Sequence, residues 1–152
     1  MIIRNFELRD LDEVMRMENE NFPDPWPRES FLYDKDNEVA SFKVLEKDEK
    51  VIGYYILYYM FENADIGNIC IDKEYQGNGL GEYLFKDLLI NCIKNEIEFV
   101  HLEVRVDNEK AYNLYSKMGF EKTRIRKGYY NGVDAIEMVK GLIGLNEEDF
   151  SN

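Results

Sequence analysis

The chain has little of what binds metals or cross-links secreted proteins. Its 152 residues include two cysteines, Cys70 and Cys92, and one histidine, His101. A structural zinc site usually needs four Cys or His ligands, so no metal site is predicted. Disulfide frameworks belong mainly to small secreted chains, so both cysteines are expected to be buried apolar residues rather than nucleophiles or bridge partners.

Long hydrophobic runs and a secretion signal are missing as well. No apolar run approaches the roughly 18 residues of a membrane-spanning helix. The first residues, Met1–Glu7, lack the basic start and the apolar stretch of a signal peptide. We therefore expect a soluble, cytoplasmic protein that makes no contact with a membrane.

Glycine and proline are scarce, which excludes collagen-like order and long disordered segments. There are ten glycines and three prolines, while 45% of the residues are hydrophobic and 14% are aromatic. At this length, one domain with one core is favoured. We expect residues 1–145 to form that domain, as a monomer or a weak dimer, and residues 146–152 to be a polar, frayed tail.

Positive charge is in deficit, and it is unevenly distributed. The net charge is −12; residues 1–76 carry nine Lys or Arg against 18 Asp or Glu, giving −9, and residues 77–152 carry ten against 13, giving −3. Within the second half, Arg105–Lys127 has seven basic and three acidic residues, a local charge of +4. An acidic chain repels a nucleic-acid backbone, so direct DNA or RNA binding is disfavoured. The asymmetry favours a cationic partner near the first half and a small anionic ligand near the second.

Hydrophobic periodicity and turn signals predict alternating strands and helices. Asp10 and Glu13 resemble a capping box that starts a helix, and Asn131-Gly132 is a hairpin signal. The predicted helices cover 10–21, Pro27–Tyr33, 80–92 and Asn108–Met118. The predicted strands cover Met1–Phe6, Val39–Glu46, Val51–Phe61, Asp65–Ile71, Phe99–Val106, Phe120–Lys127 and Ala135–Val139. This order favours an α+β or mixed α/β fold, with a central mixed sheet flanked by helices.

A glycine-rich segment, Gln76–Gly81, follows a predicted strand and opens a helix. Three glycines in five positions let the backbone approach a ligand closely, and the free N–H groups at a helix start suit a pyrophosphate. The alternative interpretation is an ordinary flexible turn, since isolated glycine motifs are common. The segment matches neither a P-loop, which ends in Gly-Lys-Ser/Thr, nor the dinucleotide-binding fingerprint.

Two further side chains are candidates for acid–base chemistry. Strand alternation puts Glu103 on the face opposite to Leu102 and Val104. There it is a general base, one half of an ion pair with Arg105, or a carboxylate on a solvated face. Tyr115 lies in a predicted amphipathic helix, so by itself it is interpreted most simply as a packing residue.

Taken together, these segments resemble the GNAT superfamily, the acyl-CoA-dependent N-acetyltransferases. The resemblance covers roughly residues 1–140. It rests on three motifs in the family's order and spacing: Gln76-x-x-Gly79-x-Gly81, Leu102–Asn108, and Ala111-x-x-Leu114-Tyr115-x-x-x-Gly119-Phe120. Within the superfamily the chain looks most like the ribosomal-protein-alanine N-acetyltransferases, through Phe22–Phe31 and Arg126–Tyr130. Asp107 departs from the family pattern, which commonly has Ser at that position.

The resemblance implies a three-layer fold with a mixed, mostly antiparallel sheet of about seven strands flanked by about four helices. It implies acetyl-CoA as the cosubstrate, with no metal, bound where two neighbouring strands splay apart. Glu103 would accept a proton, and Tyr115 would donate a proton or a hydrogen bond to the departing thiolate. The residues that would bind acetyl-CoA are Ile69, Cys70, Ile71, Gln76, Gly77, Asn78, Gly79, Leu80, Gly81 and Asn108. The residues that would line the acceptor site are Trp26, Phe31, Tyr129 and Tyr130.

The reaction that the resemblance implies is acetyl transfer to the N-terminal α-amine of a protein. It suggests alanine as the first residue and a small-subunit ribosomal protein as the acceptor. An α-amine has a reference pKa of about 7.7–8.0 and a lysine one of about 10.4, so a single carboxylate base suits the α-amine better. The alternatives are acetylation of a polyamine, an antibiotic or a lysine side chain, and a non-catalytic CoA-sensing module.

Overall fold

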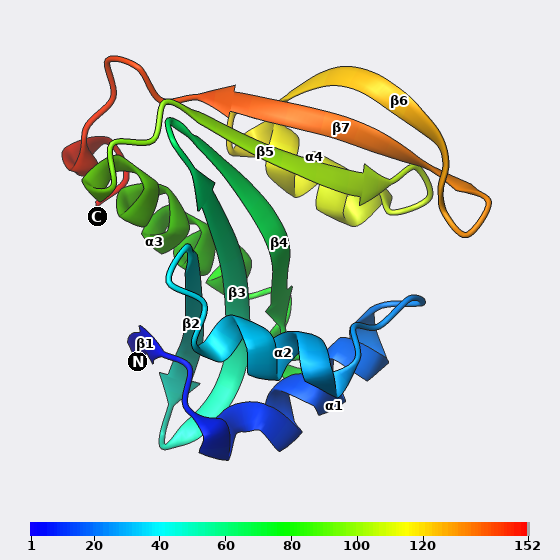
Figure 1. Cartoon of the computed structure of the whole chain (residues 1–152). Helices are drawn as coiled ribbons and strands as arrows, with labels where there is room; N and C mark the ends of the chain where they lie inside the picture. The colour runs from blue at the N-terminus through cyan, green and yellow to red at the C-terminus, as the bar shows by residue number, and fades with distance from the viewer. Residues whose placement is uncertain (152) are drawn as a thin grey trace.

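One seven-stranded sheet organises the chain (Figure 1), in a computed structural model that describes residues 1–151. The strands are β1 (Ile2–Asn5), β2 (Ala40–Lys47), β3 (Lys50–Met60), β4 (Asn63–Ile71), β5 (Phe99–Arg105), β6 (Glu121–Tyr130) and β7 (Val133–Gly141). The helices are α1 (Leu11–Asn21), α2 (Arg28–Lys35), α3 (Leu80–Lys94) and α4 (Glu109–Lys117). Short 3-10 helices cover Leu8–Asp10, Lys73–Tyr75 and Glu147–Asp149. None of the helices in this part of the chain is long and apolar enough to cross a membrane.

The sheet has the order β1-β2-β3-β4-β5-β7-β6, in which β4 and β5 are parallel and the other neighbours are antiparallel. The β4–β5 ladder is short, because it joins Asn63–Asp65 to Phe99–His101 and ends there. Beyond it the two strands diverge (Figure 1). The edges of β4 and β5 that face each other past this point therefore have no strand partner.

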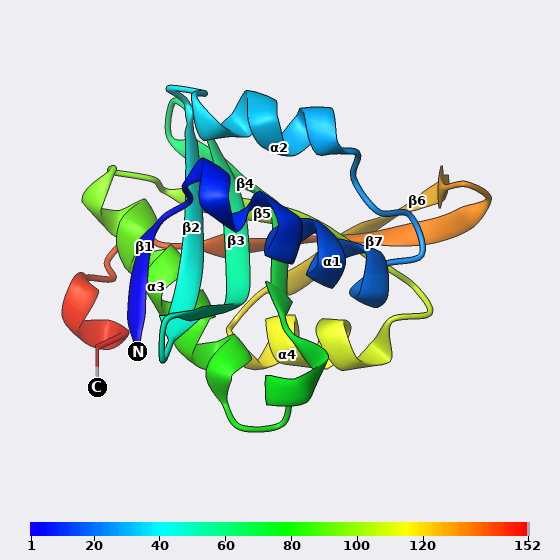
Figure 2. The same ribbon diagram turned by 90° about the horizontal axis from the view of Figure 1, so that it is seen from below.

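Helices cover both faces of the sheet and give it three layers (Figure 2). α1 and α2 lie on one face, while α3 and α4 lie on the other. β3 runs between these layers and is buried from Val51 to Leu57, which accounts for its unbroken apolar run. The core on one side includes Leu84 of α3, and the core on the other side includes Phe31 of α2.

The predicted fold class and element order are confirmed, and the element ends lie within three residues of the predicted ones. Asn131 and Gly132 both have positive φ values, 46° and 95°, as a two-residue hairpin turn requires. Pro27 flanks α2 as its N-cap instead of forming part of its first turn. The Asn-Gly signal therefore located its turn correctly, whereas the proline signal was displaced by one residue.

The predicted capping box at Asp10 is wrong. Asp10 precedes α1 in a helical conformation, and its side chain does not cap that helix. Its Oδ2 instead accepts a hydrogen bond from the backbone N–H of Glu7 at 2.8 Å, and both of its oxygens accept from Arg4. The reason is the 3-10 helix Leu8–Asp10, which moves the capped turn upstream of α1.

In the tail, residues 146–151, which the structure describes, are ordered where fraying was expected. Glu147–Asp149 forms a 3-10 helix, and the side chain of Asn146 accepts a hydrogen bond from the backbone N–H of Glu148 at 2.9 Å. Phe150 packs against the core cluster. Because one aromatic ring anchors the segment, its polar composition was a poor guide to its order.

Candidate active site

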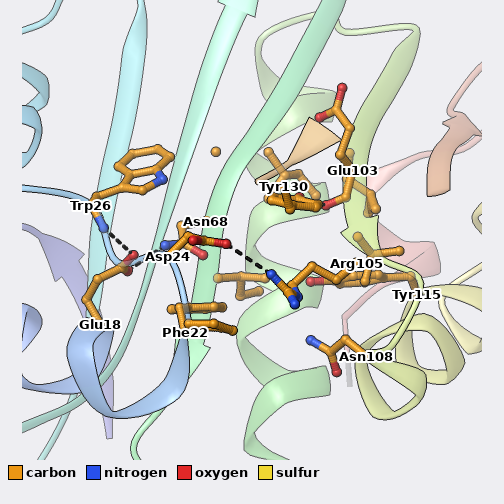
Figure 3. Close-up of a pocket in the computed structure, with 16 residues that line it drawn as sticks. Glu18, Phe22, Asp24, Trp26, Asn68, Glu103, Arg105, Asn108, Tyr115 and Tyr130 are labelled. Carbon is orange, nitrogen blue, oxygen red and sulfur yellow. Dashed lines mark hydrogen bonds and ion pairs between the residues drawn. The ribbon is translucent and has the colours of Figure 1, made fainter. Parts of the chain in front are cut away.

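Two adjoining cavities lie where β4 and β5 diverge. The large cavity, about 460 Å³, has walls from β4, the loop before α3, and α4. The small cavity, about 110 Å³, has walls from the α1–α2 loop, β4 and β5 (Figure 3). Four residues line both cavities: Phe22, Ile69, Asn108 and Tyr115. A ligand that occupied both cavities would therefore pass Tyr115.

The glycine-rich loop forms one wall of the large cavity. Gly77 and Gly79 have φ values of +83° and +77°, and a Cβ at either position would meet no heavy atom within 4 Å. α3 begins at Leu80, and its first N–H that bonds back to the loop is that of Tyr83. The earlier N–H groups of this turn are thus available to an anion.

Gln76 fixes this loop in place. Its Nε2 donates to the carbonyl of Ile71 at 2.8 Å and to Oδ1 of Asn21 at 3.0 Å. Its Oε1 accepts from Nζ of Lys110 at 3.1 Å. These bonds tie the loop to β4, α1 and α4, so the Gln76 amide supports the cavity wall.

Most of the residues predicted to bind acetyl-CoA line the large cavity, but Asn78 and Leu80 do not. Asn78 is exposed, and its Nδ2 donates to the carbonyl of Tyr75 at 3.2 Å. Leu80 is half-buried against the core. The glycine motif predicted which loop lines the cavity, but it did not show that the side chains of Asn78 and Leu80 point away from it. The predicted residues that do line it are Ile69, Cys70, Ile71, Gln76, Gly77, Gly79, Gly81 and Asn108.

Two lysines that the sequence analysis did not assign also line the large cavity. Lys110 and Lys117 lie seven residues apart on α4, a spacing that puts both on one face of a helix. Nζ of Lys117 pairs with Glu82 at 2.9 Å. The local excess of positive charge in Arg105–Lys127 was the signal that could have identified them. Cations beside a glycine-rich loop suit a polyanionic ligand.

Two further residues of the cavity wall, Asn108 and Cys70, are fixed by different means: Asn108 by a hydrogen bond and Cys70 by burial. Oδ1 of Asn108 accepts from the backbone N–H of Ala111 at 3.2 Å, which caps α4. Burial raises the pKa of Cys70 to about 12, and it does the same for Cys92. Both thiols are free and buried, so the expectation that the two cysteines are buried is confirmed.

Glu103 lines the small cavity on the strand face predicted for it. Its neighbours Leu102 and Val104 are buried on the other face. Oε1 of Glu103 accepts from Nη1 of Arg126 at 3.1 Å, and the side chain is 30% exposed. In Figure 3 the Glu103 side chain rises from β5 above the ring of Tyr130.

Arg105 is not the ion-pair partner of Glu103 that one interpretation expected. It pairs with Asp24 of the α1–α2 loop and with Asp107, each at 3.0 Å. Asp24 also accepts a hydrogen bond from Nδ2 of Asn131 at 2.8 Å. Asp24 thus connects the α1–α2 loop to the end of β5 through Arg105 and to the β6–β7 turn through Asn131.

Tyr115 is half-buried at the junction of the two cavities. Its ring packs against Phe85 and Phe120, with centroids 5.7 Å and 6.3 Å away. Burial, with a smaller contribution from Cys70, raises the pKa of Tyr115 to about 12. The hydroxyl therefore stays protonated at neutral pH and is able to donate a hydrogen bond.

Trp26 and Tyr130, two of the four residues predicted for the acceptor site, line the small cavity. Gly67 leaves room for Trp26, because a Cβ there would lie 2.8 Å from Cη2 of the indole. The hydroxyl of Tyr130 donates to the backbone carbonyl of Glu103 at 3.1 Å. Phe31 does not line the small cavity: its ring is fully buried and packs against that of Trp26, with centroids 6.0 Å apart.

Tyr129 also lies outside the small cavity. Its ring packs against that of Tyr130, with centroids 4.9 Å apart, but only Tyr130 lines the cavity. Tyr129 is 47% exposed, and its ring lies 4.4 Å from the guanidinium carbon of Arg126. It therefore contacts the residue that holds Glu103 and does not reach the cavity itself.

Glu18 lines the small cavity, and the sequence analysis missed it. The residue is only 1% exposed. Its Oε1 accepts from the hydroxyl of Tyr54 and from Nδ2 of Asn68, and its Oε2 accepts from the backbone N–H of Trp26 at 2.9 Å. Burial raises the pKa of Glu18, and these hydrogen bonds oppose that effect without cancelling it. No local pattern pointed to Glu18, because Tyr54 and Asn68 are 36 and 50 residues away in the chain.

Known proteins are similar to this chain in sequence and in fold. The chain is 40% identical over 139 residues to a Bacillus subtilis (strain 168) protein provisionally named ribosomal protein bS18-alanine N-acetyltransferase, covering 90% of this chain and 92% of that protein. It is 30% identical over 135 residues to the ribosomal protein bS18-alanine N-acetyltransferase of Escherichia coli (strain K12), covering 89% and 90%. The crystal structure of the ribosomal-protein-S18-alanine N-acetyltransferase from Escherichia coli matches with a TM-score of 0.85 at 30% identity, covering 92% of each chain.

The family model described as "Acetyltransferase (GNAT) family" matches residues 11–120. This range begins at α1 and ends after α4, so it contains the glycine-rich loop, Glu103 and Tyr115. The match spans most of the chain and agrees with the relatives and the fold. The predicted family is therefore confirmed, and the chain belongs to the acetyltransferase (GNAT) family.

Proposed function

We propose that this protein transfers the acetyl group of acetyl-CoA to the N-terminal α-amine of a protein, and that its acceptor is an alanine-initiated ribosomal protein. The observation that carries the proposal is the junction of the two cavities at Tyr115. One cavity suits a phosphate-bearing cosubstrate, and the other suits an amine. Two relatives that match nearly the whole chain are bS18-alanine N-acetyltransferases by name.

The walls of the large cavity fit acetyl-CoA. The unpaired edge of β4 at Ile69–Ile71 would take the pantetheine arm, with Asn108 beside it. The backbone of Gly77–Gly81 would take the pyrophosphate, because the space beside Gly77 and Gly79 is open and the start of a helix attracts anions. Lys110 and Lys117 would add the positive charge that a polyanion requires.

In the proposed reaction the acceptor amine attacks the thioester carbonyl, and Glu103 accepts the amine's proton, directly or through water. Tyr115 donates a hydrogen bond to the departing thiolate sulfur. A thiol has a reference pKa of about 8.5, whereas that of Tyr115 is raised to about 12. Full proton transfer would therefore be uphill by about 5 kcal/mol. Tyr115 therefore stabilises the leaving group without protonating it completely.

The small cavity fits the end of a peptide. Trp26 and Tyr130 wall it, which favours a short first side chain such as that of alanine. The acidic first half of the chain, with a charge of −9 over residues 1–76, would attract a cationic acceptor protein.

We further propose that residues 1–145 act as one catalytic domain, as a monomer or a weak dimer. The acceptor would be reached without direct contact to nucleic acid or membrane. A cytoplasmic location follows from an acceptor that is a ribosomal protein.

The experiment that tests the function compares three acceptors with acetyl-CoA and the purified protein. They are an Ala-initiated peptide, a free polyamine, and an N-blocked peptide with one lysine. The first should release CoA thiol with a kcat/KM at least about 100-fold above the others, since its amine is the least basic. A preference for the polyamine or the lysine contradicts the proposed acceptor, and no release with any amine leaves a non-catalytic module. Mass spectrometry of protein N-termini in cells with and without the protein then identifies the acceptor.

A further inference from the structure

The small cavity contains a buried carboxylate, that of Glu18, which the proposed chemistry does not use. Glu18 lies in the last turn of α1 and is 1% exposed. Burying a charge is unfavourable unless the protein or a ligand compensates it. An ionisable group kept in a cavity wall at such a cost is a candidate for a role in binding.

Three hydrogen-bond donors around Glu18 stabilise its ionised form against the opposing effect of burial. Tyr54, Asn68 and the backbone N–H of Trp26 all donate to it. An amide at this position would turn its NH2 group toward at least one of these donors, whereas a carboxylate accepts from all three. An ionised carboxylate offers about four acceptor positions, and three are occupied. The fourth, on Oε2, is available to a donor in the cavity.

The negative charge of Glu18 has no counter-charge in the described part of the chain. None of the ion pairs among residues 1–151 includes Glu18, and its three hydrogen-bond donors are neutral groups. The titratable groups that interact with it are Tyr54 of β3 and Cys70 of β4. Neither carries positive charge. Arg105, the cation among the described residues that line the small cavity, is already paired with Asp24. The cavity is therefore prepared for a cation that a ligand brings.

We infer that Glu18 supplies the counter-charge for the protonated α-ammonium group of the acceptor as it enters the small cavity. This inference rests on the proposed function, and it names a residue that selects a charged amine. Figure 3 shows Glu18 and Glu103 on opposite sides of the cavity. In that view the Glu103 carboxylate is directed away from Glu18, so the amine would bind at Glu18 first and move toward Glu103 to give up its proton.

The test separates the charge of the ammonium group from the rest of the peptide. Calorimetry measures the binding of two ligands to the CoA-bound protein: an Ala-initiated peptide, and the same peptide with its N-terminal amine replaced by hydrogen. Because CoA carries no acetyl group, no turnover interferes. The wild-type protein should bind the amine peptide at least about tenfold more tightly. The Glu18→Gln variant should bind both peptides alike and should keep its affinity for acetyl-CoA.

Asp34 provides a matched control. It is another buried carboxylate, 5% exposed, and it accepts a hydrogen bond from the hydroxyl of Tyr58. It lines neither the large nor the small cavity, so Asp34→Asn should retain the full preference for the amine peptide. If Glu18→Gln does not fold, Glu18→Met replaces it, because Met is uncharged and similar in volume.

The possible outcomes separate this inference from the proposed function. A preference that survives the Glu18 substitution overturns the inference and leaves the function in place. Equal binding of the two peptides to the wild-type protein also overturns it. If Asp34→Asn also loses the preference for the amine peptide, the loss reflects a general structural change. That outcome, too, would overturn the inference. If neither peptide binds to the wild-type protein, the proposed function and the inference both fail.

Discussion

Arg126 of β6 reaches across β7 and donates a hydrogen bond from Nη1 to Oε1 of Glu103 on β5, at 3.1 Å. The same guanidinium lies over the ring of Tyr129. Glu103 is therefore held at the edge of the small cavity by a residue from the far edge of the sheet. This contact fixes the position of the proposed proton acceptor, while 30% of the side chain stays exposed.

The first prediction concerns Glu103→Gln. This substitution keeps the shape of the side chain and removes its ability to accept a proton. Because Glu103 lines the small cavity and not the large one, turnover with an Ala-initiated peptide should fall by about 10²-fold or more. Calorimetry should show an unchanged affinity for acetyl-CoA.

Glu137→Gln is the matched control for this experiment. Glu137 is the register partner of Glu103 on the neighbouring strand and also pairs with an arginine, Arg124. It lines neither cavity, so its turnover should equal that of the wild type. If Glu103→Gln lost acetyl-CoA affinity and turnover to the same extent, Glu103 would be a structural residue only.

The second prediction concerns Tyr115→Phe, which should lower kcat by about 10²-fold, the low end of an acid–base contribution. Since the pKa of Tyr115 is raised to about 12, its hydroxyl stays protonated as the pH rises from neutral to about 10. The kcat of the wild-type protein, measured against pH, should therefore not fall over that range through ionisation of Tyr115.

Tyr112→Phe, on the same helix but outside both cavities, should leave kcat unchanged. Unaltered turnover in Tyr115→Phe would return that residue to a packing role.

Features encoded by neighbouring residues could be predicted from the sequence. The Asn131-Gly132 turn and the glycines of Gln76–Gly81 act through backbone conformation, which a short pattern reveals. The face of Glu103 followed from strand alternation in the same way. The prediction that Asp10 caps α1 was wrong, because a 3-10 helix precedes α1 and the cap lies one turn earlier. The local pattern gave no signal for this 3-10 helix.

Features that depend on distant residues were not predictable from a single sequence. Glu18 meets Asn68 across 50 positions, and Glu103 meets Arg126 across 23. Each partner is an ordinary polar residue until the sheet order brings the pair together. The burial of Phe31 was not predictable for a related reason. The sequence did not show which of the two rings, that of Trp26 or that of Phe31, faces the core.

The third prediction concerns the two lysines of the large cavity. Replacing Lys110 and Lys117 together by alanine should weaken acetyl-CoA binding by about tenfold at low ionic strength, because two cations near the proposed phosphates are lost. The difference from the wild type should shrink at high salt, since salt screens exposed charges. Calorimetry at two salt concentrations measures both effects.

Replacing Lys122 and Lys127 by alanine gives the same change in net charge on β6, outside both cavities. This control should bind acetyl-CoA as the wild type does. Equal weakening in the two double variants would mean that net charge, and not a local phosphate site, governs affinity.

The last prediction tests the glycine-rich loop, on which the cosubstrate assignment depends. Gly79→Trp should abolish acetyl-CoA binding, because Gly79 faces open space in the cavity wall and a large ring there would fill the place of the phosphates. A left-handed backbone also strains any L-residue, by about 1–2 kcal/mol, so strain must be separated from blockage. Gly144→Trp does this, since Gly144 has a φ of +86° with equally open surroundings and lies outside both cavities. The two variants should lose similar thermal stability, while only Gly79→Trp loses the calorimetric signal. Retained binding in Gly79→Trp would mean that the loop does not hold the cosubstrate.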